Sequence, residues 1–209
     1  GLDRKLHILA PELFETQNFF IEAGANDGVT QSNTYAMEKL MGSRGILVEP
    51  SLNRFSSLIN NRSDMNYFKC AALVSYDFTD DLVRLIYCDL MTLPIGKGDG
   101  TGERGYEYKH FASGTAWLPV PMKKPIRFGA EPIQLSKLIA EASAPNVIDF
   151  LSLDVEGYEA EALAGIDFSV HAFRYILIET WDLPRVRSLL PASSYDLYAQ
   201  LSQHDYLFK

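Results

Sequence analysis

The stretch from Phe19 to Thr34 reads FFIEAGANDGVTQSNT and decides the fold that we expect for this chain. Apolar residues run into an acid, Glu22, and a turn of small residues, Gly24–Gly28, follows at once. A strand that ends in such a turn and opens a helix brings bare backbone amides up to a ligand. In a parallel sheet, that position is the crevice at the carboxyl ends of the strands, where such folds bind ligands.

The rest of the chain repeats this alternation of strand-length apolar runs with helical patterns. We expect strands at 19–23, 45–48, 67–74, 147–153 and 175–178, and helices at 35–41, 52–60, 133–141 and 158–163. Near-continuous apolar strands between helices indicate a mostly parallel sheet covered by helices on both faces. The end, SYDLYAQLSQHDYLFK, alternates about a polar turn, as an antiparallel hairpin does. We predict an α/β fold in which residues 1–209 form a single domain.

A glycine- and aromatic-rich insertion at about 89–128 interrupts this alternation. Five of the ten residues from Gly96 to Gly105 are glycine, and YEYKHFASGTAW follows them. A loop of this length within a compact domain is commonly functional. We expect the insertion to form a lid that selects the molecule on which the site acts. His110, among the aromatic residues of the insertion, is a candidate general base.

The composition limits the binding partners and the cell compartment that we expect for this protein. A formal net charge of −8 argues against nucleic acid or an anionic membrane surface as the main partner, because both reward basic patches. The two cysteines, Cys70 and Cys88, form no CxxC motif and fit a reducing cytosol. No apolar run approaches the ~18 residues of a membrane span. We therefore expect a cytoplasmic protein whose main partner is neither nucleic acid nor a membrane, with an oligomeric state that the sequence leaves undetermined.

The small-residue turn excludes two kinds of phosphate site. No GxxxxGK followed by Ser or Thr is present, and the dinucleotide fingerprint GxGxxG fails because Asn26 takes its middle glycine position. A carboxylate at Glu22 would repel phosphate but suits an ammonium or sulfonium group. Glu49, 25 residues after Gly24, ends the second strand near where an acid receives two ribose hydroxyls. These residues describe a nucleoside with a positive tail, such as S-adenosylmethionine, although both acids could instead cap the following helices.

Four segments carry a resemblance to a known family: FIEAGANDGVTQSNT, GILVEP, FLSLDVEGYEAEALAGID and ILIET. In this order they resemble the FkbM family of S-adenosylmethionine-dependent methyltransferases over almost the whole chain. The resemblance implies a Rossmann-like class I methyltransferase fold and O-methylation of a hydroxyl on a saccharide or polyketide-type small molecule. It also implies a cofactor pocket in which Glu22, Gly24, Asn26 and Gly28 line the methionine part, Glu49 holds the ribose hydroxyls, Pro50 and Ser51 flank the base, and Cys70, Ala71 and Ala72 lie against the adenine.

The reacting side of the site is expected at the next strand ends. Asp154 ends the strand FLSL and Glu179 ends YILI, and period-2 geometry would put Asp154 and Glu156 on one face of an extended segment. Either strand-end acid could act as a base toward a hydroxyl. A divalent cation such as Mg²⁺, held by both with Asp182 as a third ligand, could instead activate the acceptor. Acids here also suit helix capping, and His204 in the last hairpin is a further candidate base.

Two other functional classes stay open at this point. One is a dinucleotide-dependent oxidoreductase, against which the incomplete GxGxxG weighs. The other is a non-catalytic module that keeps a nucleoside pocket. Such a module would be expected to lose the acids at its strand ends, yet Glu22, Glu49, Asp154 and Glu179 are all present.

Overall fold

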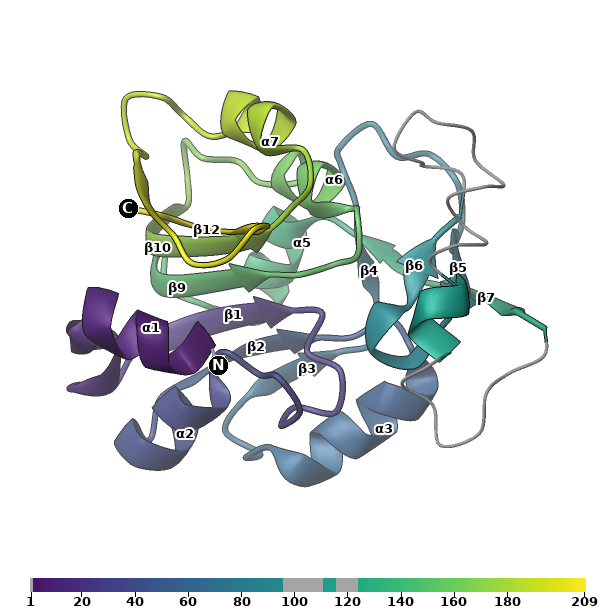
Figure 1. The fold of residues 1–209 in the computed structure, drawn as a ribbon, viewed down its shortest axis with the longest axis horizontal. Helices are drawn as coiled ribbons and strands as arrows, with labels where there is room; N and C mark the ends of the chain where they lie inside the picture. Colours follow the sequence, from purple (N-terminus) through teal and green to yellow (C-terminus); the bar gives the residue numbers. More distant parts are fainter. Residues whose placement is uncertain (1, 96–110, 116–123) are drawn as a thin grey trace.

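The computed structural model describes residues 2–95, 111–115 and 124–209 and confirms an α/β fold on a seven-stranded sheet (Figure 1). The strand order is β11-β12-β10-β9-β1-β2-β3. In chain order, the strands of this sheet are β1 (Phe19–Ala23), β2 (Arg44–Val48), β3 (Tyr67–Lys69), β9 (Val147–Leu153), β10 (Ala172–Glu179), β11 (Leu197–Gln200) and β12 (Asp205–Phe208).

The order of the strands reverses direction at β1, in the middle of the sheet. From β1 the chain steps outward to β2 and β3, whereas β9 and β10 extend the sheet on the other side of β1, and all five strands run parallel. β1 and β9 pair from Phe20 with Phe150 to Ala23 with Leu153. In open α/β sheets, ligands bind beyond the carboxyl ends of the strands at such a switch point.

The C-terminal strands form the predicted antiparallel hairpin. β12 pairs antiparallel with β10 and with β11, so it lies between them. The pairing of Glu179 with Asp205 places the hairpin turn at the carboxyl end of β10. The last part of the chain therefore reaches the same edge of the sheet as the turn after β1.

Two layers of helices cover the sheet (Figure 1). One layer consists of α1 (Leu2–Leu9), η1 (Pro11–Phe14), α2 (Tyr35–Met41) and α3 (Leu52–Asn61), and the other of α5 (Leu135–Glu141), α6 (Glu159–Leu163) and α7 (Leu183–Leu189). Phe20 of β1 packs into the core cluster of the first layer, and its neighbour Ile21 packs into that of the second. Strands buried on both faces explain the continuous apolar runs in the sequence. No helix within the described ranges is long and apolar enough to cross a membrane.

The apolar run 67–74 is not the single strand that its pattern predicts. β3 ends at Lys69, and a separate short strand, β4 (Ala72–Leu73), pairs with β8 (Pro132–Ile133) in a second sheet. The chain has thus left β2 and joined a partner from a distant part of the sequence. Apolar character marks both halves of the run equally, so it could not reveal the change of partner.

Part of the insertion predicted at 89–128 is regular structure rather than loop. Three antiparallel strands in the order β6-β5-β7 stand beyond the carboxyl ends of the main parallel strands (Figure 1). Their bounds are β5 (Val83–Tyr87), β6 (Leu93–Pro94) and β7 (Ile126–Ala130). The glycine cluster and His110 lie outside the described residues, so the lid and the role of His110 stay predictions.

Candidate active site

A cavity of about 1070 Å³ opens at the carboxyl ends of the parallel strands. Its wall comes from the ends of β1, β2, β9 and β10, from β4 and β5, and from the turn of the C-terminal hairpin. The residues of the sequence prediction that line it are Glu22, Gly24, Asn26, Glu49, Pro50, Ala71, Ala72, Asp154 and Glu179. One cavity therefore joins the residues expected to hold the cofactor to the two acids expected to act at the acceptor.

The two glycines of the turn after β1 contact different parts of the chain. Gly24 has φ +82°, and a Cβ on it would lie 1.7 Å from the backbone oxygen of Asp154. Glycine is therefore required where the ends of β1 and β9 approach each other. Gly28, with φ +80°, is not in the cavity wall, since a Cβ there would lie 2.7 Å from side-chain carbons of Arg62 and Leu58. Gly28 therefore packs against the end of α3, and its contact with a cofactor stays a prediction.

Ser51 and Cys70 also lie behind the wall rather than in it. The backbone N–H of Ser51 donates to Oε1 of Glu49 at 2.8 Å. Sγ of Cys70 lies 3.9 Å from the carbonyl oxygen of Pro50. Both residues thus support a neighbour that does line the cavity, and direct contact of either with a cofactor stays a prediction.

Glu49, directly after β2, brings a buried carboxyl group to the cavity. Its Oε2 accepts the backbone N–H of Asn26 at 3.0 Å, and its Oε1 accepts that of Ser51 at 2.8 Å. Burial raises the pKa of Glu49 to about 7, although these two hydrogen bonds oppose the rise. Each carboxylate oxygen can accept a further hydrogen bond. The two hydroxyls of a ribose would supply such donors.

Asn26 provides an independent sign of a ligand. The residue is buried in the cavity wall with φ 48°, and its side-chain Oδ1 has no hydrogen-bond partner among the described residues. Buried polar atoms in folded proteins nearly always have a partner. A donor group on a bound molecule, such as an ammonium or a hydroxyl, would complete the site. The hydrogen-bond acceptors of this wall therefore fit the donor groups on the aminoacyl and ribosyl parts of S-adenosylmethionine.

The raised pKa of Glu49 gives a first prediction for the unligated protein. A carboxyl group whose pKa rises on folding stabilises the fold fully below its unfolded pKa, and this stability is lost as the pH rises through the folded value. Burial also raises the pKa of Glu159 to about 7. We expect the free energy of unfolding to fall between about pH 5 and pH 8, by up to ~3 kcal/mol for each group.

Urea titrations at the two pH values measure this change. Glu49→Gln should remove the contribution of Glu49 and flatten the pH dependence. A variant that loses as much stability as the wild type over this range would show that burial does not shift the pKa of Glu49.

Glu22 also lines the cavity, but its carboxylate is occupied by the loop that follows β1. Its Oε1 accepts the backbone N–H of Asn33 at 2.7 Å. Its Oε2 accepts the hydroxyls of Thr34 at 2.6 Å and Ser32 at 2.8 Å. Glu22 therefore shapes the cofactor side of the wall, and its direct contact with a cationic ligand stays a prediction.

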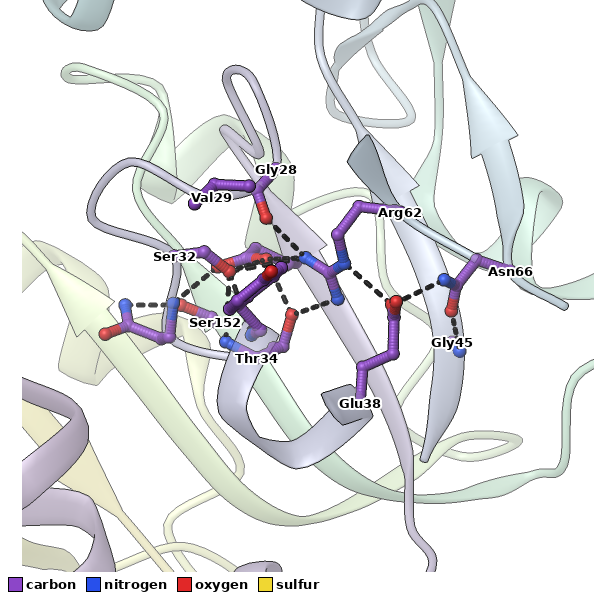
Figure 2. A network of polar contacts seen from close by, with 12 residues as sticks. Gly28, Val29, Ser32, Thr34, Glu38, Gly45, Arg62, Asn66 and Ser152 are labelled. Atoms are coloured by element: carbon purple, nitrogen blue, oxygen red, sulfur yellow. Dashed lines mark hydrogen bonds and ion pairs between the residues drawn. The ribbon is translucent and has the colours of Figure 1, made fainter. Parts of the chain in front are cut away.

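Arg62, which the sequence reasoning missed, holds this loop from behind (Figure 2). Its fully buried guanidinium donates to Oε2 of Glu38 at 2.7 Å and to the carbonyl of Gly28 at 3.1 Å. It also donates to Oγ1 of Thr34 at 3.0 Å and pairs with Glu22 at 3.3 Å. Burial alone would raise the pKa of Glu38, but the hydrogen bond and charge of Arg62 outweigh it and leave that pKa below its ordinary value.

Asp154 and Glu179 form a hydrogen-bonded carboxyl pair at the ends of β9 and β10. Burial, and then the charge of Glu179, raise the pKa of Asp154 well above its ordinary value. Burial also raises the pKa of Glu179, while the hydrogen bond from Asp154 opposes this rise. The hydrogen bond between them thus favours the protonated form of Asp154 and the charged form of Glu179.

Two details of the predicted acidic cluster need correction. The segment after Asp154 is not extended, because Glu156 has φ 54° and Gly157 has φ 94°, and Glu159 closes the resulting turn by accepting the N–H of Gly157 at 2.9 Å. Asp182 is the N-cap of α7, where its Oδ1 accepts a backbone N–H of the first turn at 3.1 Å. In the described ranges, no group of three or more His, Cys, Asp or Glu residues could hold a metal ion. The arrangement of donors thus gives the Mg²⁺ prediction no support.

The structure adds Trp181 and His204 to the wall. The side chain of Trp181 is 77% exposed, and its ring lies against that of His204, with 4.6 Å between the ring centroids. Sequence reasoning named His204 only as one of two candidate histidines and gave no role to Trp181. A single tryptophan in a strand-to-helix connection carries no periodic signal that could have identified it.

Comparisons with known proteins agree with this geometry. No curated protein matches the chain. A crystal structure of methyltransferase FkbM from Methylobacillus flagellatus KT shares the fold, with a TM-score of 0.54 and 12% sequence identity. The match covers 99% of this chain and 47% of that one, so the chain spans about half the length of that protein. The methyltransferase FkbM domain family matches residues 22–207, which is most of the sequence, and the protein therefore belongs to that family.

Proposed function

We propose that this chain binds S-adenosylmethionine in the cavity and transfers its methyl group to a hydroxyl oxygen of a saccharide or polyketide-type small molecule. Family membership supports the methyl donor. The observation that carries the proposal is the carboxyl group of Glu49, buried at the end of β2 with two backbone donors and its remaining acceptor capacity turned to a cavity. Burial makes the charged form of this group costly, and the two hydrogen bonds and the charge of Arg54 offset that cost only in part.

Different residues of the cavity wall would bind different parts of the cofactor. Glu49 would accept the ribose hydroxyls, and Oδ1 of Asn26 would accept a donor from the aminoacyl part. Pro50, Ala71 and Ala72 present an apolar stretch of the same wall that suits an adenine ring. When bound, S-adenosylmethionine supplies a methyl group activated by its sulfonium sulfur. The protein's tasks are to align the acceptor with that carbon and to take up the acceptor's proton.

The acceptor side of the cavity favours a neutral ring with hydroxyl groups. The Asp154–Glu179 pair offers hydrogen-bonding oxygens at the ends of β9 and β10, and the exposed indole of Trp181 offers a flat apolar surface in the same wall. A carboxylate-rich wall disfavours anionic acceptors. Because the Asp154–Glu179 pair offers hydrogen-bonding oxygens, we place the acceptor hydroxyl beside it. The same pair supports an enzyme over a non-catalytic nucleoside-binding module.

Calorimetry with S-adenosylhomocysteine tests the cofactor part, and Glu49→Gln gives the second prediction. A glutamine amide accepts hydrogen bonds only at its oxygen, so it cannot be the acceptor for both ribose hydroxyls in the way that two carboxylate oxygens can. We therefore expect the affinity for S-adenosylhomocysteine to fall by ~1.5–3 kcal/mol, or roughly 10- to 150-fold. Glu131→Gln is a matched control, since Glu131 is exposed and pairs with Lys69 away from the cavity wall. Equal affinities for the two variants would remove Glu49 from the ribose role.

A further inference from the structure

We propose that His204 is the catalytic base of this site, that its Nδ1 takes the proton of the acceptor hydroxyl, and that Glu179 orients its ring. This inference rests on the methyl transfer proposed above and names the residue that performs its proton step. A histidine suits the task because its ordinary pKa lies near neutral pH.

The fold fixes His204 at the cavity. The residue stands in the turn between β11 and β12, immediately before the strand that pairs with β10. Its carbonyl oxygen accepts the N–H of Thr180 at 2.7 Å, and its own N–H donates to Oγ of Ser202 at 3.1 Å. These bonds tie the turn to the end of β10, so the imidazole keeps its place beside Glu179. Both side chains line the same cavity as Asp154.

The neighbouring carboxyl groups set the tautomer of the ring. Nε2 of His204 lies 3.4 Å from Oε1 of Glu179. The hydrogen bond with Asp154 opposes the rise that burial causes in the pKa of Glu179 and so favours its carboxylate form, which can accept from a second donor. The hydrogen of a neutral imidazole therefore belongs on Nε2, facing Glu179, and the lone pair belongs on Nδ1.

Nδ1 is the nitrogen that still needs a partner. It is buried and makes no hydrogen bond to any residue that the structure describes. A buried polar atom in this condition calls for a partner from outside the chain. The hydroxyl of an acceptor in the cavity would donate to it. Trp181 stacks on the ring at an interplanar angle of 31°, which limits ring rotation and keeps Nδ1 in place.

The proton step balances with a sulfonium methyl donor. The O–H bond of the acceptor breaks and its proton passes to Nδ1 of His204. The electron pair left on the oxygen forms the new bond to the methyl carbon, and the carbon–sulfur bond breaks with its pair on sulfur, whose positive charge disappears. The resulting imidazolium lies beside the Glu179 carboxylate, which stabilises it.

Other charged groups lie near the ring. The charges of Glu156 and Asp205 act on Glu179 and raise its pKa. Asp182 and Arg185, at the start of α7, also line the cavity and bring opposite charges. The other two described histidines are not in the cavity wall, since His7 packs on Phe14 near the N-terminus and His171 is buried just before β10.

The third prediction tests His204 with His204→Gln. The glutamine amide can still donate to Glu179 but cannot take a proton. Turnover is measured with isotope-labelled S-adenosylmethionine and a panel of methyl glycosides. We expect a loss of ~10²- to 10⁴-fold with unchanged affinity for S-adenosylhomocysteine, and loss of the acidic limb of the pH–rate profile. His7→Gln, at an exposed position, should behave as the wild type. Wild-type turnover by His204→Gln would overturn the assignment.

A second measurement needs no acceptor. Nitrogen-15 spectra of the neutral imidazole should show hydrogen on Nε2 and none on Nδ1. The opposite tautomer would overturn the proposal. Failure of the wild type to bind S-adenosylhomocysteine would overturn the proposed function alone, because the ring spectra would still decide the state of His204.

Discussion

Replacing Arg62 with methionine is expected to lower the free energy of unfolding by about 3–5 kcal/mol. The guanidinium is fully buried and pairs with the carboxylates of Glu22 and Glu38, which are themselves buried. Without it, Glu22 would have no ion pair left within the described part of the chain, and Glu38 would keep only the pair that its Oε1 makes with Lys39 at 3.1 Å. The loop 24–34, which forms part of the cavity wall, would also lose its bond from Arg62 to the Gly28 carbonyl. We therefore expect weaker binding of S-adenosylhomocysteine in the same variant.

Urea titration of Arg62→Met against Arg174→Met measures this effect. Arg174 pairs with Asp149 at 3.2 Å on the surface, with 60% of its side chain exposed, so its loss should change stability by at most ~1 kcal/mol. Arg62→Lys should fall between the two, because an ammonium keeps the charge but cannot serve several acceptors in a plane. If Arg62→Met were no less stable than Arg174→Met, the network in Figure 2 would not hold the loop.

Glu179→Gln is expected to reduce turnover by ~10²- to 10⁴-fold while the protein stays folded. The amide has no charge with which to stabilise an imidazolium at His204. Asp154→Asn should be much milder, because Asp154 serves as a protonated donor to Glu179 and an asparagine amide can still donate. The two substitutions make a matched pair, since each exchanges a carboxyl group for an amide in adjacent strand ends.

The assay uses labelled S-adenosylmethionine with and without a chelator. We expect the chelator to have no effect. A loss in Asp154→Asn as large as that in Glu179→Gln would show that Asp154 works in its ionised form. Activity that vanished with the chelator and returned with Mg²⁺ would instead assign the pair to a cation.

Much of the main sheet could be predicted because its strands are buried on both faces. β1 and β9 have the predicted bounds, since a continuous apolar run marks a strand that helices cover on both sides. β5 escaped prediction because Arg84, its one exposed residue, breaks its apolar run. Strand pairing is a long-range property, and no local pattern showed that Leu73 joins Ile133 rather than continuing beside β2.

The cavity wall was predictable where a residue directly follows a strand of the main sheet. Glu49 and Asp154 follow apolar strands, so their side chains had to emerge at one edge of the sheet. The contact of Gly28 with Arg62 could not be predicted, because Arg62 lies 34 residues away along the chain. The ring partner of His204 could not be inferred either, since only the pairing of β10 with β12 brings Trp181 to it.

A crystal structure determined with saturating S-adenosylhomocysteine tests most directly the claim that this cavity binds the methyl donor. We expect the nucleoside at the end of β2, with both ribose hydroxyls about 2.5–3.0 Å from the carboxylate oxygens of Glu49. The aminoacyl part should extend past Gly24 and give Oδ1 of Asn26 its missing partner. The sulfur should point toward the Asp154–Glu179 pair. A nucleoside bound elsewhere, or ribose hydroxyls turned away from Glu49, would contradict the proposed cofactor site.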